Sequence, residues 1–302
     1  MSRRSLVTAL VVAVISIMTL AGLTMAVFTA TGSAPDFTLG GRIALLEVNG
    51  VISSDEVFLD DVRRLRRDGS VRGWVVSINS PGGVVAPSQS IYETLRRLRA
   101  EDGMPVVASI GSVGASGGYY VALAADSILA LPGSITGSIG VVMQYPNVQE
   151  LMDKVGVRME VVKAGEQKDL GSPFRRMDEE ERAIIGALIT DVHEQFIEVV
   201  AEARGLPESE VRPLADGRVL SGRQALEVGL VDRMGNLDEA ISVAGQLAGL
   251  GSSPRIVRPT RSEGNWLLEA VLGESTARAV QEIATRVAGP LVSWPTVKYM
   301  LQ

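Results

Sequence analysis

Two serines in the stretch GSVGASGGYY, residues 111–120, are the best-placed candidate nucleophiles of this sequence. Ser116 stands directly before two glycines, whereas Ser112 is followed by a bulky valine and is expected to sit deeper against the preceding strand. A serine at the start of a helix lies where free amides and the helix dipole favour a developing oxyanion. The letters also match the G-x-S-x-G elbow of serine hydrolases. We favour Ser116 as nucleophile, with a helix-capping serine as the alternative.

A serine hydroxyl is a weak nucleophile unless a neighbouring group removes its proton. The chain has no cysteine and one histidine, His193, which falls inside a predicted long helix and is expected to serve packing or the surface. Of four lysines, Lys168 lies in a loop bounded by glycine and proline, AGEQKDLGSPF, just after the strand-like RMEVVKAG. A lysine base near neutral pH needs its pKa lowered from about 10.4 to about 7–8, which requires desolvation. An ordinary exposed loop lysine is the alternative.

A second glycine-rich loop, INSPGG, follows another apolar run. Two glycines after a proline let the backbone turn sharply and expose a bare amide, here that of Gly83. Such an amide could hold an oxyanion, although an ordinary strand-to-helix turn has the same letters.

The composition excludes several classes of function. The net charge of −6 argues against nucleic acid as a partner. The absence of cysteine removes disulfides and thiolate zinc sites, and a single histidine excludes a multi-histidine metal site within one chain. A serine nucleophile with a lysine base implies neither a metal nor an organic cofactor.

The elements that must position these loops alternate along the chain. Continuous apolar runs predict buried strands, and amphipathic segments between them predict helices. Such an alternation, which persists to about residue 165, is typical of an α/β fold with a parallel sheet covered on both faces. The predicted strands are 42–48, 71–80, 104–110 and 128–131, and the predicted helices are 57–68, 87–101, one ending near 125, and a long one starting near 177.

The N-terminal segment Leu6–Phe28 is uncharged and mostly aliphatic. About 20 such residues span a bilayer, and arginines 3 and 4 precede the segment, so we expect a membrane anchor with a cytoplasmic N-terminus and an extracytoplasmic body. A cleaved signal sequence is the alternative. The expected division is an anchor (1–30), a tether (31–41), a catalytic domain (42–250) and a C-terminal helical tail (251–302).

Together the loops resemble the signal peptide peptidase A family of membrane-bound Ser-Lys proteases, in its short bacterial form. The matching segments cover residues 40–245 in one order and are INSPGG, GSVGASGGYYVALAAD, GSITGSIGV, GEQKDLGSPFR and DGRVLSGRQALEVGLVD. The resemblance implies a fold similar to those of Clp protease and crotonase (ββα-type), with a parallel sheet and surrounding helices after one N-terminal transmembrane helix.

The resemblance also implies a role for each matching residue. It places the nucleophile on Ser116, the general base on Lys168, the oxyanion-hole amides on Gly83 and Gly117, and a lysine-orienting hydroxyl on Ser138. It implies homo-oligomers in which the serine and the lysine can come from adjacent subunits, and peptide substrates that include released signal peptides at the membrane.

The sequence thus predicts a membrane-anchored serine endopeptidase. One alternative is an acyl-CoA hydratase or isomerase of the crotonase type, which uses a similar oxyanion hole but forms no acyl-serine. Another is a membrane scaffold that keeps the fold without the activity.

Overall fold

The computed structural model describes residue 19, residues 40–259 and residues 298–300. The chain divides into two units, Met1–Gly40 and Gly41–Gln302, and only the second is described at length. The predicted anchor and the amphipathic stretches of the C-terminal tail lie outside the described residues. Within the described residues no helix is long and apolar enough to cross a bilayer.

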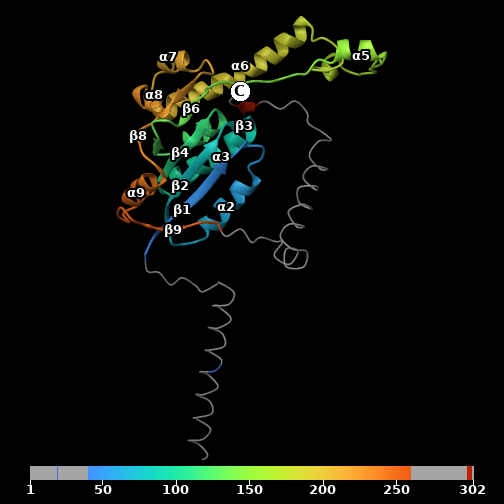
Figure 1. Ribbon diagram of the computed structural model, residues 1–302. Helices are drawn as coiled ribbons and strands as arrows, with labels where there is room; N and C mark the ends of the chain where they lie inside the picture. Colours follow the sequence, from blue (N-terminus) through green and yellow to red (C-terminus); the bar gives the residue numbers. More distant parts are fainter. Residues whose placement is uncertain (1–18, 20–39, 260–297, 301–302) are drawn as a thin grey trace, which may run out of the picture. The chain divides into compact units, whose positions relative to one another are not determined.

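A mostly parallel mixed sheet forms the centre of the second unit (Figure 1). Its order is β7-β6-β4-β2-β1-β9, with β5 pairing β4 and β8, and every pair in it is parallel except β6 with β7. The predicted α/β sheet is therefore confirmed. The strands are β1 Arg42–Asn49, β2 Val71–Ser80, β4 Val106–Ala115, β5 Ser127–Ala130, β6 Ile135–Gly137, β7 Val219–Ser221, β8 Arg233–Met234 and β9 Arg255–Val257.

Helices cover both faces of this sheet, as its apolar strands require. One face packs against α2, α3, α4 and α6 around Trp74, Tyr119 and Phe196, and the other against α9 around Leu45 and Ile241. The helices are α2 Glu56–Arg66, α3 Val85–Ala100, α4 Gly117–Ala122, α5 Gln149–Val155, α6 Glu179–Arg204, α7 Glu208–Val211, α8 Gly222–Glu227 and α9 Leu237–Leu247, with 3₁₀ turns η1 Glu166–Asp169 and η2 Arg212–Leu214.

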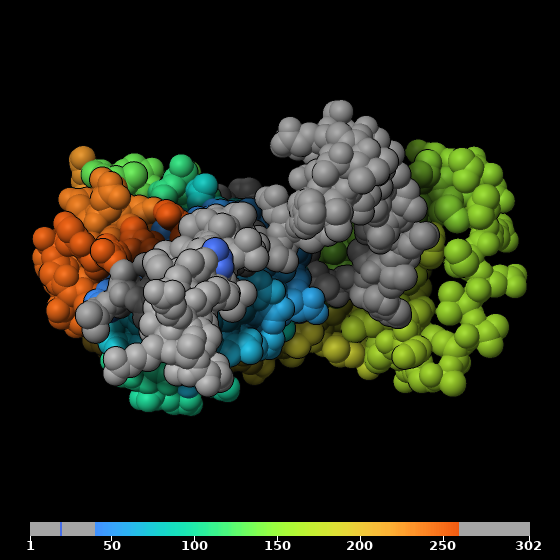
Figure 2. Space-filling model, turned by 90° about the horizontal axis from the view of Figure 1, so that it is seen from below, coloured from blue at the N-terminus to red at the C-terminus, as the bar shows by residue number. Residues whose placement is uncertain are grey.

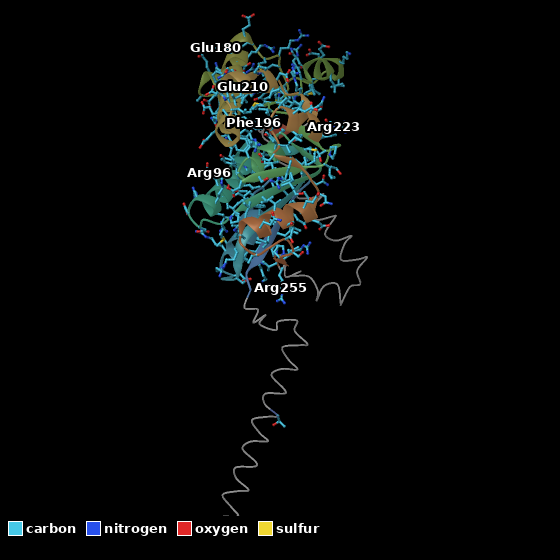
Figure 3. The ribbon with its side chains drawn as sticks, turned by 90° about the vertical axis from the view of Figure 1, so that its left-hand side faces the viewer. Arg96, Glu180, Phe196, Glu210, Arg223 and Arg255 are labelled. Carbon is cyan, nitrogen blue, oxygen red and sulfur yellow. The ribbon has the colours of Figure 1, made fainter. Side chains whose placement is uncertain are left out.

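Helix α6 links the body of the molecule to its periphery. Asp178 caps its N-terminus and forms a reciprocal capping box with Glu181. Its C-terminal half packs into the core through Phe196, whereas its N-terminal half carries exposed Ile184 and Leu188. Figure 3 shows Glu180 at the far end of the helix and Phe196 among the core side chains. The apolar residues of α6 are thus buried over only part of its length.

Residues 142–178, which we call the arm, extend away from the sheet beside the N-terminal half of α6 (Figures 1 and 2). The strand-like segment within it is not a strand in the described structure, because it finds no neighbouring strand to pair with. Val162 in this segment is fully exposed. The other exposed large apolar side chains of the arm are Leu151, Val155, Val157, Met159, Val161 and Phe174.

A separate two-stranded ladder lies at the end of the sheet. Strand β3, Gly82–Val84, follows β2 and pairs antiparallel with β10, Lys298–Met300, with Tyr299 opposite Gly83. The C-terminal tail, expected to be helical, therefore contributes strands β9 and β10.

Candidate active site

Ser116 occupies the junction between β4 and α4. Strand β4 runs five residues past its predicted end because Val113–Ala115 pair with β6. The Ser116 backbone has φ +52° and ψ −119°, a conformation that costs free energy in a residue with a Cβ. Its amide donates to the carbonyl oxygen of Gly137 at 2.8 Å, which holds this turn in place. The strain is typical of residues that a fold positions for function.

The Ser116 side chain is enclosed but unpaired. The residue is 0% exposed, and its Oγ has no hydrogen-bond partner among the described residues. A buried hydroxyl normally finds a partner, since leaving it unpaired costs about 1–3 kcal/mol. The competing Ser112 is exposed on β4, not deeper in the fold as expected from the sequence. Of the two candidate nucleophiles, Ser116 is therefore the one whose hydroxyl is held in a fixed, enclosed position.

Ser138 lies next to Ser116 at the end of the neighbouring strand. The parallel register pairs Ala115 with Gly137, so Ser116 and Ser138 leave adjacent strands side by side. Ser138 is also nearly buried and also has φ +52°, and its amide donates to the carbonyl oxygen of Arg218 at 2.8 Å. The structure thus brings together two predicted site residues that are 22 positions apart.

Gly83 lies in β3 between two backbone neighbours. Ile52 occupies one side of β3: its amide donates to the Gly82 carbonyl oxygen at 2.9 Å, and its carbonyl oxygen accepts from Val84 at 2.7 Å. Because backbone groups alternate along a strand, the Gly83 N–H and C=O face the opposite side, where β10 pairs. A Cβ at position 83 would lie 2.1 Å from the Ile52 oxygen, so only glycine fits this approach.

Ser80 joins this edge to the start of α4. Its Oγ accepts from the Gly82 amide at 3.1 Å, which fixes the turn into β3. A Cβ on Gly118 would lie 2.7 Å from the Ser80 carbonyl oxygen, so α4 begins against the same residue. The first amides of a helix have no partner within it, so that of Gly117 is available at the same end of the sheet as the Gly83 amide, which faces β10. Sequence reasoning missed the role of Ser80, although the motif INSPGG contains it.

Lys168 lies far from this cluster, in η1 on the arm, with an exposed side chain. Figure 1 shows the arm and α5 well away from β4 and β6. The structure therefore does not bring Lys168 and Ser116 together within one described chain. His193 lies within α6 as expected, and no hydrogen bond in the described residues joins it to Ser116.

An ion-pair network that sequence reasoning missed fixes the turn around Lys168. Asp169 accepts from Lys163 at 2.5 Å and from Arg175 at 2.9 Å, and Arg175 also pairs with the buried Glu181. Hydrogen bonds from these cations hold the pKa of the Asp169 carboxyl well below its usual range, and the Arg175 hydrogen bond lowers the pKa of Glu181. The only signal in the sequence was the density of opposite charges after residue 163.

Comparison with known proteins places the chain in a family. The pattern of peptidase family S49 matches residues 99–251, half of the chain. A presumed protease of Synechocystis sp. is 43% identical over 211 residues, which cover 69% of this chain and 75% of that protein. A presumed signal peptide peptidase SppA of Enterococcus faecium is 34% identical over 213 residues, covering 66% of this chain and 62% of the relative. The chain therefore belongs to peptidase family S49, the family expected from its motifs.

Members of this family are serine proteases, and the prediction of an enzyme of this class is confirmed. Among solved structures, the chain is similar to a membrane-bound stomatin-specific protease, with a TM-score of 0.47 and 15% identity over 74% of this chain and 100% of that one.

Proposed function

We propose that this S49 protease hydrolyses peptides with a catalytic pair, Ser116 and Lys168, that two copies of the chain complete. The observation that carries the proposal is the contrast between a buried, strained, unpartnered serine hydroxyl and an exposed lysine on a projecting arm. A neighbouring copy that inserts its arm would desolvate the lysine amine and supply the missing partner of the hydroxyl.

The chemistry then follows from the positions of the groups. The Ser116 oxygen attacks a peptide carbonyl carbon while the neutral Lys168 amine takes the hydroxyl proton, and the amine later returns a proton to the leaving nitrogen. The amides of Gly83 and Gly117 stabilise the oxyanion of the tetrahedral intermediate. Ser138, beside Ser116, orients the lysine. Water then hydrolyses the acyl-serine and restores the enzyme.

The edge of β3 that pairs with β10 supports extended peptides as substrates. The chain's own residues 298–300 already pair with it as an antiparallel strand. A substrate peptide that binds in the same way uses main-chain hydrogen bonds for affinity, which is the mode of strand-addition recognition. Such recognition places a peptide carbonyl beside the Gly83 amide.

The apolar surface of the arm supports assembly into a homo-oligomer. Monomeric proteins rarely leave so many large aliphatic side chains exposed along one segment. Burial of these side chains between copies removes them from water and carries Lys168 into the interface.

We further propose that the segment Leu6–Phe28 anchors the protein in the cell membrane, with the catalytic domain (42–250) extracytoplasmic. Peptides released near that membrane, signal peptides among them, are the proposed substrates. Support comes from the uncharged segment itself and from relatives named signal peptide peptidase. No cofactor takes part in the proposed reaction.

Covalent labelling tests the proposed nucleophile. A peptidyl fluorophosphonate reacts with an activated serine, and peptide mass mapping then locates the adduct. We expect the adduct on Ser116, unchanged labelling of Ser112→Ala, and much slower labelling of Lys168→Ala. An enzyme that hydrolyses peptides while the adduct forms elsewhere would refute the assignment. The labelling also distinguishes a protease from an acyl-CoA hydratase, which forms no acyl-serine.

A further inference from the structure

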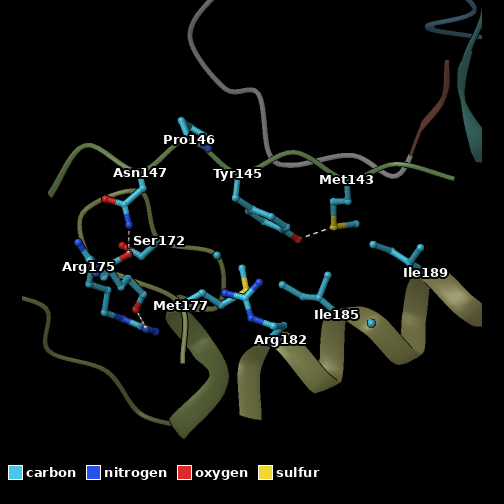
Figure 4. A pocket seen from close by; sticks show the side chains of 13 residues that line it. Met143, Tyr145, Pro146, Asn147, Ser172, Arg175, Met177, Arg182, Ile185 and Ile189 are labelled. Carbon is cyan, nitrogen blue, oxygen red and sulfur yellow. Dashed lines mark hydrogen bonds between the residues drawn. The ribbon is translucent and has the colours of Figure 1, made fainter. Parts of the chain in front are cut away.

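A pocket of about 510 Å³ lies between the arm and the N-terminal half of α6 (Figure 4). This volume is in the range of small-ligand sites. Its apolar surface comes from side chains of the arm and of α6: Met143, Tyr145, Met177, Ile185 and Ile189. Gly171 shapes one wall, because a Cβ there would lie 2.3 Å from a Tyr145 ring carbon. The ring can therefore pack directly against the backbone at this point.

Three arginines line this pocket, and they differ in their partners. Arg175 pairs with Asp169 and Glu181, and Arg176 pairs with Glu150 at 2.7 Å. The Arg182 guanidinium has no carboxylate or carbonyl partner among the residues that the structure describes. Figure 4 shows its side chain between those of Met177 and Ile185, extending toward the segment that carries Tyr145. One cation is thus unneutralised beside an apolar surface.

A second polar group faces the same space. The hydroxyl oxygen of Ser172, which also lines the pocket, accepts only a long hydrogen bond from the Phe174 amide at 3.4 Å. Its own proton remains available for donation. Guanidinium and hydroxyl groups are donors that bind carboxylate oxygens, and the apolar surface of the pocket matches an aliphatic or aromatic side chain.

We propose that this pocket binds the free C-terminal carboxylate of an apolar peptide. Arg182 pairs with the carboxylate, and the last side chain of the peptide packs against Tyr145 and Ile185. The role of this pocket in catalysis rests on the proposed function. Gly171 follows Lys168 by three residues, so an assembly that carries Lys168 to Ser116 carries the pocket there as well.

The chemistry of this pocket defines a substrate class. A site that selects a free carboxylate favours short apolar peptides with exposed ends over internal segments of intact proteins. Such peptides are products of an earlier endoproteolytic cleavage.

Binding to the Ser116→Ala protein tests the pocket without turnover. The probe is one apolar peptide carrying an N-terminal fluorophore, prepared with a free C-terminal carboxylate and, separately, with a C-terminal amide. Fluorescence anisotropy should show the acid form binding about tenfold more tightly, as expected for one charge-assisted pair. Arg182→Gln should remove this preference and leave the amide form unchanged. Arg176→Gln, the matched control, should keep the preference because that arginine is already paired with Glu150.

A blocking variant gives an independent measurement. Gly186 lines the pocket and a Cβ there meets nothing within 4 Å, so Gly186→Leu adds side-chain volume at the pocket with no clash at its Cβ and with better helix propensity. It should weaken binding of both peptide forms while the oligomer mass stays constant. Equal affinity of the two forms, or a preference that survives Arg182→Gln, would overturn the proposal. So would a change of oligomer mass in either variant, which would make the pocket a subunit contact.

These outcomes separate the pocket from the catalytic proposal. A carboxylate preference that depends on Arg182, in a protein whose wild-type form shows no hydrolysis through Ser116, would leave the pocket standing and refute the proposed catalytic pair.

Discussion

The end of the central sheet and the arm are held in place by different interactions. At the sheet end, Ser116 and Ser138 are fixed by strand register, backbone hydrogen bonds and positive φ angles, and both are nearly inaccessible to solvent. On the arm, Lys168 is exposed, its turn is held by ion pairs around Asp169, and apolar side chains face outward.

This difference indicates which part of the proposed site each copy can complete alone. The core of one chain preorganises the nucleophile and the backbone donors, because buried strands leave their ends little freedom. The arm has no comparable support among the described residues of one chain. Its exposed aliphatic surface is the kind that a second copy covers. The base would then be available only in the assembled protein.

The largest expected loss of activity comes from a substitution at the end of the sheet, where the proposed nucleophile lies. Ser116→Ala should lower kcat for peptide hydrolysis by roughly 10⁴-fold or more, since no other hydroxyl is held in the same position. Thermal unfolding should change little, because the lost oxygen makes no hydrogen bond in the described structure. Ser112→Ala, on the strand that leads to Ser116 but exposed, should keep full activity. Substantial residual hydrolysis by Ser116→Ala would move the nucleophile elsewhere.

Removal of the base should have the next largest effect. Lys168→Ala should reduce kcat by roughly 10²–10⁴-fold, the usual contribution of a general base, with KM nearly unchanged. Lys154→Ala is the control, because Lys154 is also an exposed lysine of the arm. Equal, small effects of the two substitutions in steady-state kinetics would show that neither lysine acts as the base.

The apolar surface of the arm can be tested through a charge. Val162→Asp introduces a carboxylate where the proposed interface is apolar, and burial of an unpaired polar group costs about 1–3 kcal/mol. The variant should need a protein concentration at least roughly tenfold higher than wild type to assemble, and activity should follow assembly. The matched control is Val57→Asp in the first turn of α2, where the valine is also exposed. Mass photometry across a dilution series measures both variants, and identical masses would place the interface elsewhere.

The smallest expected effect concerns the ion pairs of the arm. Arg175 lowers the pKa of Asp169 and of Glu181, so their contribution to stability is complete above the ordinary carboxyl pKa near 4 and is lost as the pH falls through the lowered values. In the Arg175→Gln protein the arm amides should therefore exchange faster at neutral pH. Their protection should show a smaller further loss below about pH 4 than in the wild-type protein.

Hydrogen exchange of residues 163–181 measures this effect. Arg176→Gln, which removes only an exposed pair, should behave like the wild-type protein. Equal pH profiles for wild type and Arg175→Gln would show that the network does not hold the arm.

The sequence predicted the sheet end well because local patterns determine it. Continuous apolar runs located β1, β2 and β5 to within a residue or two, and the glycine-rich loops after β2 and β4 marked the turns that carry Gly83 and Ser116. These features depend on burial and backbone conformation, which composition and spacing reflect directly.

The arm could not be predicted in the same way. The alternating segment around Val162 has the pattern of a strand, but a strand also needs a partner, and none lies beside it in the described chain. The ion pairs of Arg175 depend on how the arm folds back on α6, which charge spacing alone does not specify. A partner on another copy would leave no signal that a single sequence could reveal.

Subunit mixing tests most directly whether two copies complete the proposed catalytic pair. Ser116→Ala and Lys168→Ala proteins, each inactive, are mixed in equal amounts under conditions that exchange subunits, with mass photometry of tagged chains as the check on exchange. If each site takes its serine from one copy and its lysine from the next, about one quarter of the sites regain both groups, and activity returns to about that fraction of wild type. No recovery in fully exchanged oligomers would contradict the account.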